Sequence, residues 1–199
     1  SVGFETDFAL FNQFAGLSFN TIATTRLQGG GKRLSTATTA AEVTSNVVEF
    51  DLQDSFKQNI LGSSPLVRYH WKRAPSYFDC VIYDGSSSAG TLDVKHNLAA
   101  KPELIIAKKR SKVSAWGVIT SITASNFLVT GTMNTAPLST QTYSSTSYLP
   151  SEPTDTSLIV NTDTGIGSSG NFIAYLFASL AGVSKVGSYT GNGSSQTID

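Results

Sequence analysis

The two histidines and the single cysteine are the side chains of this sequence best suited to metal or nucleophilic chemistry. His70 and His96 stand 26 positions apart, without the i, i+4 pairing or the cysteine pair that would complete a zinc site. Cys80 alternates with Phe78 and Ile82 on an apolar face, which is typical of a buried, inert thiol. We therefore expect no metal ligand and no catalytic cysteine or histidine, with His70 on the solvent face of a strand and His96 at the start of a turn.

Two glycine-rich stretches match parts of nucleotide-binding signatures. Residues 165–170 follow the GxGxxG pattern, but that loop must join a strand to a helix, with an acidic residue about 20 positions later. The segment after this motif has a strand pattern, and it contains no acidic residue before the last position. Residues 29–32 lack the remainder of a phosphate loop, because Arg26 and Arg33 occupy its Gly and Ser/Thr positions. We predict a glycine-rich hairpin turn at 165–170 and no nucleotide cofactor.

Two pairs of aspartates, Asp51 with Asp54 and Asp79 with Asp84, are close enough in sequence to suggest acid–base chemistry. A glycosidase needs two carboxyl groups about 5 to 9 Å apart, and nothing in the sequence distinguishes these from solvated strand and turn residues. The basic run at 108–112 follows a strand pattern and lacks interleaved aromatic residues, so it indicates a solvated loop. No catalytic, cofactor-binding or metal-binding residue is predicted, and we do not expect an enzyme.

The composition indicates which elements hold these residues. Only 14% of the 199 residues are charged, against roughly 25% in an average soluble domain. Their place is taken by 28 Ser and 23 Thr, which disfavour helix interiors, while Thr and the aromatics suit a pleated surface. The sequence therefore predicts an all-β protein, and its single cysteine leaves stability to packing rather than disulfides.

Charge and hydropathy exclude two classes of partner. The formal net charge is zero, so the chain has no electrostatic footprint for nucleic acid or anionic lipid. No stretch approaches the ~18 to 20 apolar residues of a membrane span, and the first residues do not have the pattern of a signal peptide. We expect neither nucleic-acid binding nor membrane insertion.

An internal repeat gives the predicted organisation. A shift of 106 positions brings six identical residues into register without a gap. The coincident pairs are Tyr69 with Tyr175, Tyr83 with Tyr189, Gly85 with Gly191, Ser88 with Ser194, Thr91 with Thr197 and Asp93 with Asp199. A second match, shifted by about 96, places residues 7–11 on residues 103–107. We predict two related units, 1–93 and 94–199, with a long surface loop at 132–156.

Most segments have the alternating pattern of strands. Alternation predicts a strand at residues 77–83. A hairpin is predicted from the strand patterns at 116–122 and 127–129, with its turn at 124–126. Further strands are predicted at 157–160 and 171–180. The N-terminus is ambiguous, because Phe4, Phe8, Phe11 and Phe14 have helical spacing. Its match to residues 104–106 favours a strand.

The repeat also predicts exposure. The face of Val67, Tyr69 and Trp71, and that of Ile173, Tyr175 and Phe177, should both be core. The opposite face carries Arg68, His70 and Lys72 in the first unit but Ala174, Leu176 and Ala178 in the second. We expect the first of these faces to meet water and the second to be covered by a neighbouring unit or subunit.

Four stretches carry a family resemblance: 73–85, 96–98 with 101–110, 172–178 and 187–194. In order, they resemble a repeated β-rich domain of tail-fibre and other structural proteins of tailed bacteriophages. Residues 7–12, 31–35 and 69–73 match more loosely. The chain departs from the family pattern at Asp84 and Ser86-Ser87, where a tight Asn-Gly turn is usual.

The resemblance implies lectin-like or jelly-roll sandwich units in tandem, within a longer protein, and brings no catalytic residues. It implies a structural, adhesive component of a virion appendage that works as a homo-oligomer, with a trimer as the expected form, alongside other virion proteins. Two alternatives remain. One is a carbohydrate-binding module in which exposed aromatics such as Tyr143 or Tyr148 stack on host-surface glycans, and the other is a virion-associated polysaccharide depolymerase.

Overall fold

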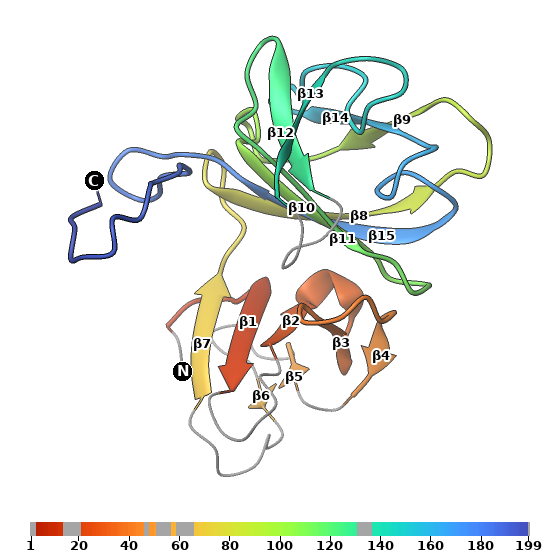
Figure 1. Ribbon diagram of the computed structural model, residues 1–199. Helices are drawn as coiled ribbons and strands as arrows, with labels where there is room; N and C mark the ends of the chain where they lie inside the picture. Colours follow the sequence, from red (N-terminus) through yellow and green to blue (C-terminus); the bar gives the residue numbers. More distant parts are fainter. Residues whose placement is uncertain are drawn as a thin grey trace.

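Antiparallel β-strands carry almost all of the regular structure (Figure 1). The computed structural model describes residues 3–13, 21–45, 48–50, 57–58, 66–130 and 137–198. Within these residues the helical content is a single 3-10 turn, η1 (Arg26–Gln28), so the predicted all-β class is confirmed.

The N-terminal sheet has the strand order β4-β3-β2-β1-β7. Its strands are β1 (Phe8–Gln13), β2 (Thr21–Thr25), β3 (Lys32–Ser35), β4 (Val43–Thr44) and β7 (Leu66–Trp71). The strand expected at the N-terminus is confirmed in β1 despite the helical spacing of its phenylalanines. Alternation places Phe8 and Phe11 on opposite faces of the sheet, and both side chains are buried.

The central sheet has the order β13-β12-β11-β10-β15-β8. Its strands are β8 (Phe78–Gly85), β10 (Leu104–Lys109), β11 (Trp116–Thr120), β12 (Asn126–Thr130), β13 (Ser139–Thr142) and β15 (Gly170–Phe177). The predicted hairpin is confirmed as β11 and β12, with Ile119 opposite Val129. Beyond Ser121, whose φ is 51°, Ile122 packs in the cluster on the opposite side of the sheet from Trp116.

Two short sheets complete the described strands. β9 (Thr91–Lys95) pairs with β14 (Ser157–Asn161), and β5 (Val48–Glu49) pairs with β6 (Lys57–Gln58). The predicted loop at 132–156 is not wholly irregular, since it contains β13 and the buried Leu149.

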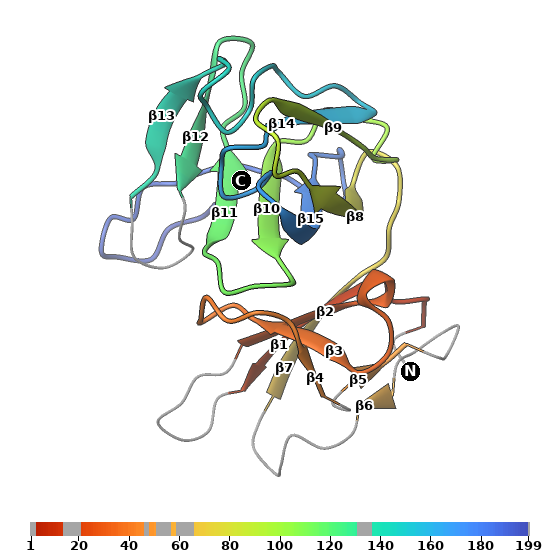
Figure 2. The ribbon, with the colours of Figure 1, turned by 90° about the vertical axis from the view of Figure 1, so that its right-hand side faces the viewer.

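The central sheet is covered on both faces, so the chain forms a stack of β layers (Figure 2). One face packs on β9 and β14 through a cluster that includes Ile105, Ala174, Leu158 and Val160. The other face packs on the N-terminal sheet through a cluster of Phe8, Ala23, Leu34, Phe78, Cys80, Trp116, Ile173 and Tyr175. Because β15 lies between both clusters, its near-continuous apolar sequence is what a strand buried on two sides requires.

The face of Ala174, Leu176 and Ala178 is buried inside this chain. The sequence predicted a neighbouring unit or subunit as its cover, and this is corrected: Val94 of β9 and Leu158 of β14 belong to the same cluster. A partner therefore has no access to that face.

The expectation for β7 was wrong in part. Val67 and Tyr69 are 38% and 49% exposed, whereas only Trp71 packs against the core between the sheets. The reason is that β7 is an edge strand, and its Trp71 end alone reaches Phe78 and Phe177 of the central sheet.

The strand pairing also bears on how the chain divides. The boundary predicted between residues 93 and 94 falls inside β9, and β8 and β9 pair with β15 and β14. The pairing changes earlier, between β7 in the N-terminal sheet and β8 in the central one.

Candidate functional site

An apolar pocket of about 470 Å³ lies between the N-terminal sheet and the central sheet. Its buried floor consists of Phe8, Ala23, Trp116 and Tyr175. Half-buried side chains form its rim: Leu10, Thr21, Thr36, Trp71, Leu104, Ile106 and Phe177. We call this cavity the interlayer pocket.

Aromatic rings shape the interlayer pocket. Phe8 stacks on Trp71 with ring centroids 4.9 Å apart and lies 4.6 Å from Tyr175. Trp116 stacks beside Tyr175 at 6.4 Å. Such pairs contribute about 0.5 to 1.5 kcal/mol each beyond area burial, so they stabilise this arrangement of the walls.

Polar bonds close one end of the pocket, where the segment between β3 and β4 meets the β10–β11 hairpin (Figure 2). The indole nitrogen of Trp116 donates to the carbonyl oxygens of Ser35 and Thr38 at 3.1 and 3.2 Å. The Arg110 guanidinium binds the Glu42 carboxylate at 2.7 and 3.1 Å, a bidentate contact between the two layers.

Lys108 lies beside this end of the pocket and is fully buried. Its ammonium donates to the carbonyl oxygens of Thr39 at 3.3 Å and Lys109 at 3.0 Å. Burial, followed by the charge of Lys109, lowers the pKa of Lys108 to about 8. The expectation of a solvated loop over 108–112 was wrong at Lys108 and Arg110, because β10 packs against the N-terminal sheet.

A polar cleft of about 410 Å³ opens at the other end, where the chain crosses from β7 to β8. Its charged lining is balanced, with Glu5, Asp7 and Asp79 against Arg26, Lys72 and Arg73. The Asp7 carboxylate accepts the backbone N–H of Arg73 at 2.8 Å and lies 3.5 Å from the Arg73 guanidinium. The Arg26 guanidinium donates to the carbonyl oxygens of Thr6 and Phe50.

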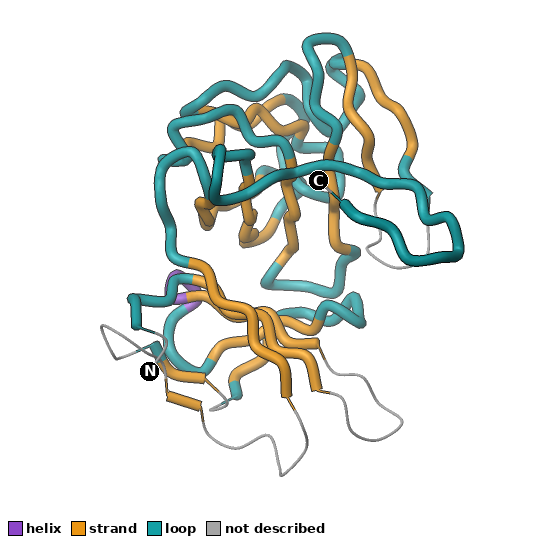
Figure 3. Tube along the Cα trace, turned by 90° about the vertical axis from the view of Figure 1, so that its left-hand side faces the viewer, coloured by secondary structure: helices purple, strands orange, loops and turns teal. Residues whose placement is uncertain are grey.

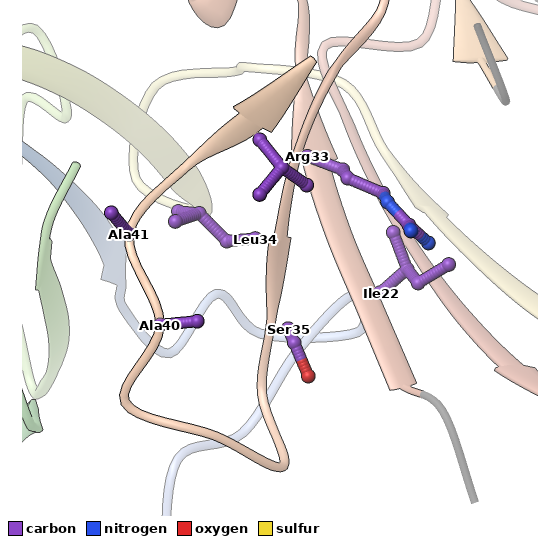
Figure 4. Close-up of a pocket in the computed structure, with 7 residues that line it drawn as sticks. Ile22, Arg33, Leu34, Ser35, Ala40 and Ala41 are labelled. Atoms are coloured by element: carbon purple, nitrogen blue, oxygen red, sulfur yellow. The ribbon is translucent and has the colours of Figure 1, made fainter. Parts of the chain in front are cut away.

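A smaller pocket of about 150 Å³ lies on the N-terminal sheet (Figure 4). In Figure 4, Ile22, Arg33 and Ser35 come from neighbouring strands, and Ala40 and Ala41 from the segment that leads into β4. This volume is below the roughly 300 Å³ of an ordinary small-molecule site.

The side chains singled out for nucleophilic chemistry are separated and held in structural bonds. Cys80 is fully buried, and burial raises the pKa of its thiol to about 12, as an inert thiol requires. The Asp79 carboxylate accepts the backbone N–H groups of Cys80 at 2.9 Å and Asn97 at 2.7 Å. Asp84 lies exposed at the far end of β8, where the side chain of Asn171 donates to it. Asp51 and Asp54 lie outside the described residues.

The histidines differ from each other. His70 is half-buried on β7, with its ring edge-on to Phe11, so its placement on a solvent face holds only in part. His96 is buried directly after β9, and its Nδ1 accepts the backbone N–H of Leu98 at 3.3 Å. Burial lowers the pKa of both imidazoles.

The 165–170 motif is a turn but not a hairpin, since it connects β14 to β15 of a different sheet. A Cβ at Gly167 would lie 2.2 Å from the carbonyl oxygen of Asn161. One at Gly85 would lie 2.2 Å from that of Ser168. The glycines therefore permit close backbone packing.

The aromatics proposed to stack on sugars are not exposed platforms. Tyr143 is half-buried against Phe127, with its hydroxyl donating to the carbonyl oxygen of Thr123 at 2.7 Å. Tyr148 packs against the core cluster of the central sheet. Their faces are engaged within the chain, which corrects the expectation of exposure.

Two further features are absent from the described residues. No group of three or more His, Cys, Asp or Glu among them is arranged to hold a metal ion. None of their helices has the length and apolar character to cross a membrane.

A family model described as "Domain of unknown function (DUF7483)" matches residues 72–198. The chain belongs to the DUF7483 family. No curated protein matches the chain, and no solved structure does. The DUF7483 match begins directly after β7, so it contains the central sheet and the β9–β14 sheet.

The DUF7483 region supplies one wall of the interlayer pocket, and the preceding residues supply the other. Sequence reasoning did not find this pocket, because its walls lie on strands far apart in the chain. The one available signal was that Phe8, Trp71 and Tyr175 are aromatic residues within segments already expected to be strands.

Proposed function

We propose that this chain is a structural module of a tailed-bacteriophage virion, in a tail fibre or similar surface appendage, with a role in host adhesion. The observation that carries the proposal is that the buried acidic and basic side chains form hydrogen bonds with the backbone of the fold. Asp7, Asp79, His96 and Lys108 are the four buried acidic or basic side chains among the described residues. Each is bonded to backbone groups.

This use of charge suits a rigid module better than an enzyme. Catalytic groups are held so that they can act on a substrate, whereas these groups join adjacent segments of one fold. The Arg110–Glu42 pair and the Trp116 indole additionally connect the N-terminal sheet to the central sheet. The resemblance to fibre domains supports the same role.

The proposal extends to the architecture. We infer two related sandwich-like units, lectin-like or jelly-roll in topology, arranged in tandem as in modular fibres. The change in strand pairing between β7 and β8, and the start of the DUF7483 match at residue 72, favour a division near residue 72, which leaves only the Tyr69–Tyr175 pair of the repeat between the two units. The chain would act as a homo-oligomer, with a trimer as the proposed form, next to other virion proteins.

The experiment is localisation in the particle that encodes this chain. Antibodies against the purified protein should label a tail appendage by immunogold electron microscopy, and light scattering should give a trimer mass. Detection only in infected cells and not in purified particles would overturn the virion assignment. Release of reducing sugar from host polysaccharide would overturn the non-enzymatic role in favour of a depolymerase.

The polar cleft is a second candidate, for carbohydrate binding. It offers charged donors and acceptors together with the side chain of Asn97, the groups that recognise sugar hydroxyls. Lys72 is exposed in it, so Lys72→Ala should weaken binding on a glycan array without unfolding the protein. Equal glycan binding by Lys72→Ala and wild type, or no binding by either, would remove the cleft as the adhesive site.

A further inference from the structure

We propose that the interlayer pocket is a binding site for a small, uncharged molecule that is mostly hydrocarbon. The pocket holds about 470 Å³, within the roughly 300–1,000 Å³ of small-molecule sites. It is also about three times the size of an engineered apolar cavity that binds benzene. This inference goes beyond the virion role and does not depend on it.

The lining determines the class of ligand. Among its described residues there is no charged side chain, and the two threonines direct their hydroxyl protons elsewhere. The Thr36 hydroxyl donates to the carbonyl oxygen of Thr21 at 3.3 Å, and that of Thr21 donates to the side chain of Asn12 at 3.4 Å. A sugar or an anion entering the pocket would lose several bonds to water, and the buried Tyr175 hydroxyl, which has no partner in the described structure, would replace few of them, whereas an apolar molecule loses none.

The pocket is held open by its surroundings. At one end the Trp116 indole of the central sheet is bonded to the carbonyl oxygens of Ser35 and Thr38 in the N-terminal layer, and at the other end the chain passes directly from β7 into β8. These links join the two sheets at both ends. A preformed cavity costs the protein little rearrangement on binding, so an apolar ligand gains the full contact of its walls.

The chain carries its own reporter for this site, because both of its tryptophans line the pocket. Titration of the full chain with the neutral fluorophore N-phenyl-1-naphthylamine should give saturable, one-to-one binding. Tryptophan emission should fall as the emission of the probe rises. Dodecanol and naphthalene should displace the probe if they share the site, with the stronger competitor indicating an aliphatic or an aromatic ligand, while glucose should not displace it.

Ala23→Phe tests the location. Ala23 is buried in the floor, so the added ring should occupy the cavity and weaken probe binding at least about tenfold. Ala40→Phe is the matched control, since Ala40 is exposed and lines only the smaller pocket of Figure 4. If Ala23→Phe fails to fold by circular dichroism, Thr21→Phe at the half-buried rim replaces it.

Three results would overturn the proposal. The first is no saturable binding of the probe to the wild type. The second is equal affinity in wild type and in the folded pocket-filling variant. The third is a wild-type oligomer that a pocket-filling variant dissociates, because the pocket would then receive a second copy of this chain.

Discussion

Replacing Lys108 by methionine should stabilise this protein at neutral pH. Lys108 has no exposed surface, and its ammonium has only two carbonyl oxygens, those of Thr39 and Lys109, as partners in the described structure. No carboxylate is bonded to it there. A buried charge without a counter-ion is costly, and an apolar side chain of similar length removes that cost.

The magnitude follows from the pKa of Lys108. Burial lowers it from 10.5 to about 8, and this difference of about 2.5 pH units corresponds to roughly 3 kcal/mol against the charged form in the fold. Methionine also loses two hydrogen bonds, each contributing about 0.5 to 1.5 kcal/mol. The net gain expected for Lys108→Met at pH 7 is therefore about 0 to 2 kcal/mol in the free energy of unfolding.

The free-energy penalty for burying the Lys108 charge depends on pH. Below about pH 8 both states of the wild type hold the Lys108 proton, and the penalty is fully present. Between about 8 and 10.5 the unfolded chain holds a proton that the folded chain has released, so this group's contribution to stability improves as pH rises. The advantage of Lys108→Met should shrink over that interval.

Urea unfolding at steps from pH 7 to 10 measures this, read as the difference between variant and wild type. The difference is needed because burial raises the pKa of Cys80 from 9.0 to about 12, which lowers stability over part of the same interval in both proteins. Lys112→Met is the matched control, because Lys112 is exposed in the same basic run, so its replacement removes a lysine charge without relieving burial and should not stabilise the protein at pH 7. A destabilised Lys108→Met, or a difference that is flat with pH, would refute the reasoning.

Three further predictions concern stability and reactivity. Glu42→Ala should lower the free energy of unfolding in urea by about 2 to 3 kcal/mol, because it leaves the largely buried Arg110 guanidinium unpaired. Glu152→Ala, at the more exposed pair with Lys101, should lower it by less than about 1 kcal/mol, and equal losses would contradict this. Gly167→Ala should lose at least about 2 kcal/mol by thermal unfolding because its Cβ meets backbone, while Gly187→Ala, in open space, should be tolerated. The Cys80 thiol should react with Ellman's reagent only after urea is added, and prompt labelling of the folded protein would show that its burial is misassigned.

Much of the local structure was predictable because apolar and polar residues alternate along a half-buried strand. The hairpin of β11 and β12 and the strands β14 and β15 appear where the pattern indicated. Of the apolar face predicted on β8, Phe78 and Cys80 are buried, whereas Ile82 is 48% exposed. The inert character of Cys80 also followed from its apolar neighbours. Each of these depends on residues within a few positions of one another.

The polar anchors were not predictable in the same way. The Lys108 ammonium contacts Thr39, and Arg110 pairs with Glu42, across about 70 positions of sequence. A basic run is ordinarily solvated, and Lys108 is buried only because β10 packs against the N-terminal sheet. Figure 3 shows the N-terminal sheet and the central sheet from another side. The chain passes from the first sheet to the second in the connection that follows β7.

The sequence by itself determined the all-β class and the two faces of the strands that it predicted, because alternation and a hydroxyl-rich composition act locally. Only the tertiary structure decided which face each strand buries and against what. It covered Ala174 and Leu176 with β9 and β14 rather than with a partner, left Tyr69 exposed on an edge, and brought both tryptophans to one pocket. The physical reason is that alternation divides a strand into two faces, whereas the layer that covers a face comes from distant segments of the chain.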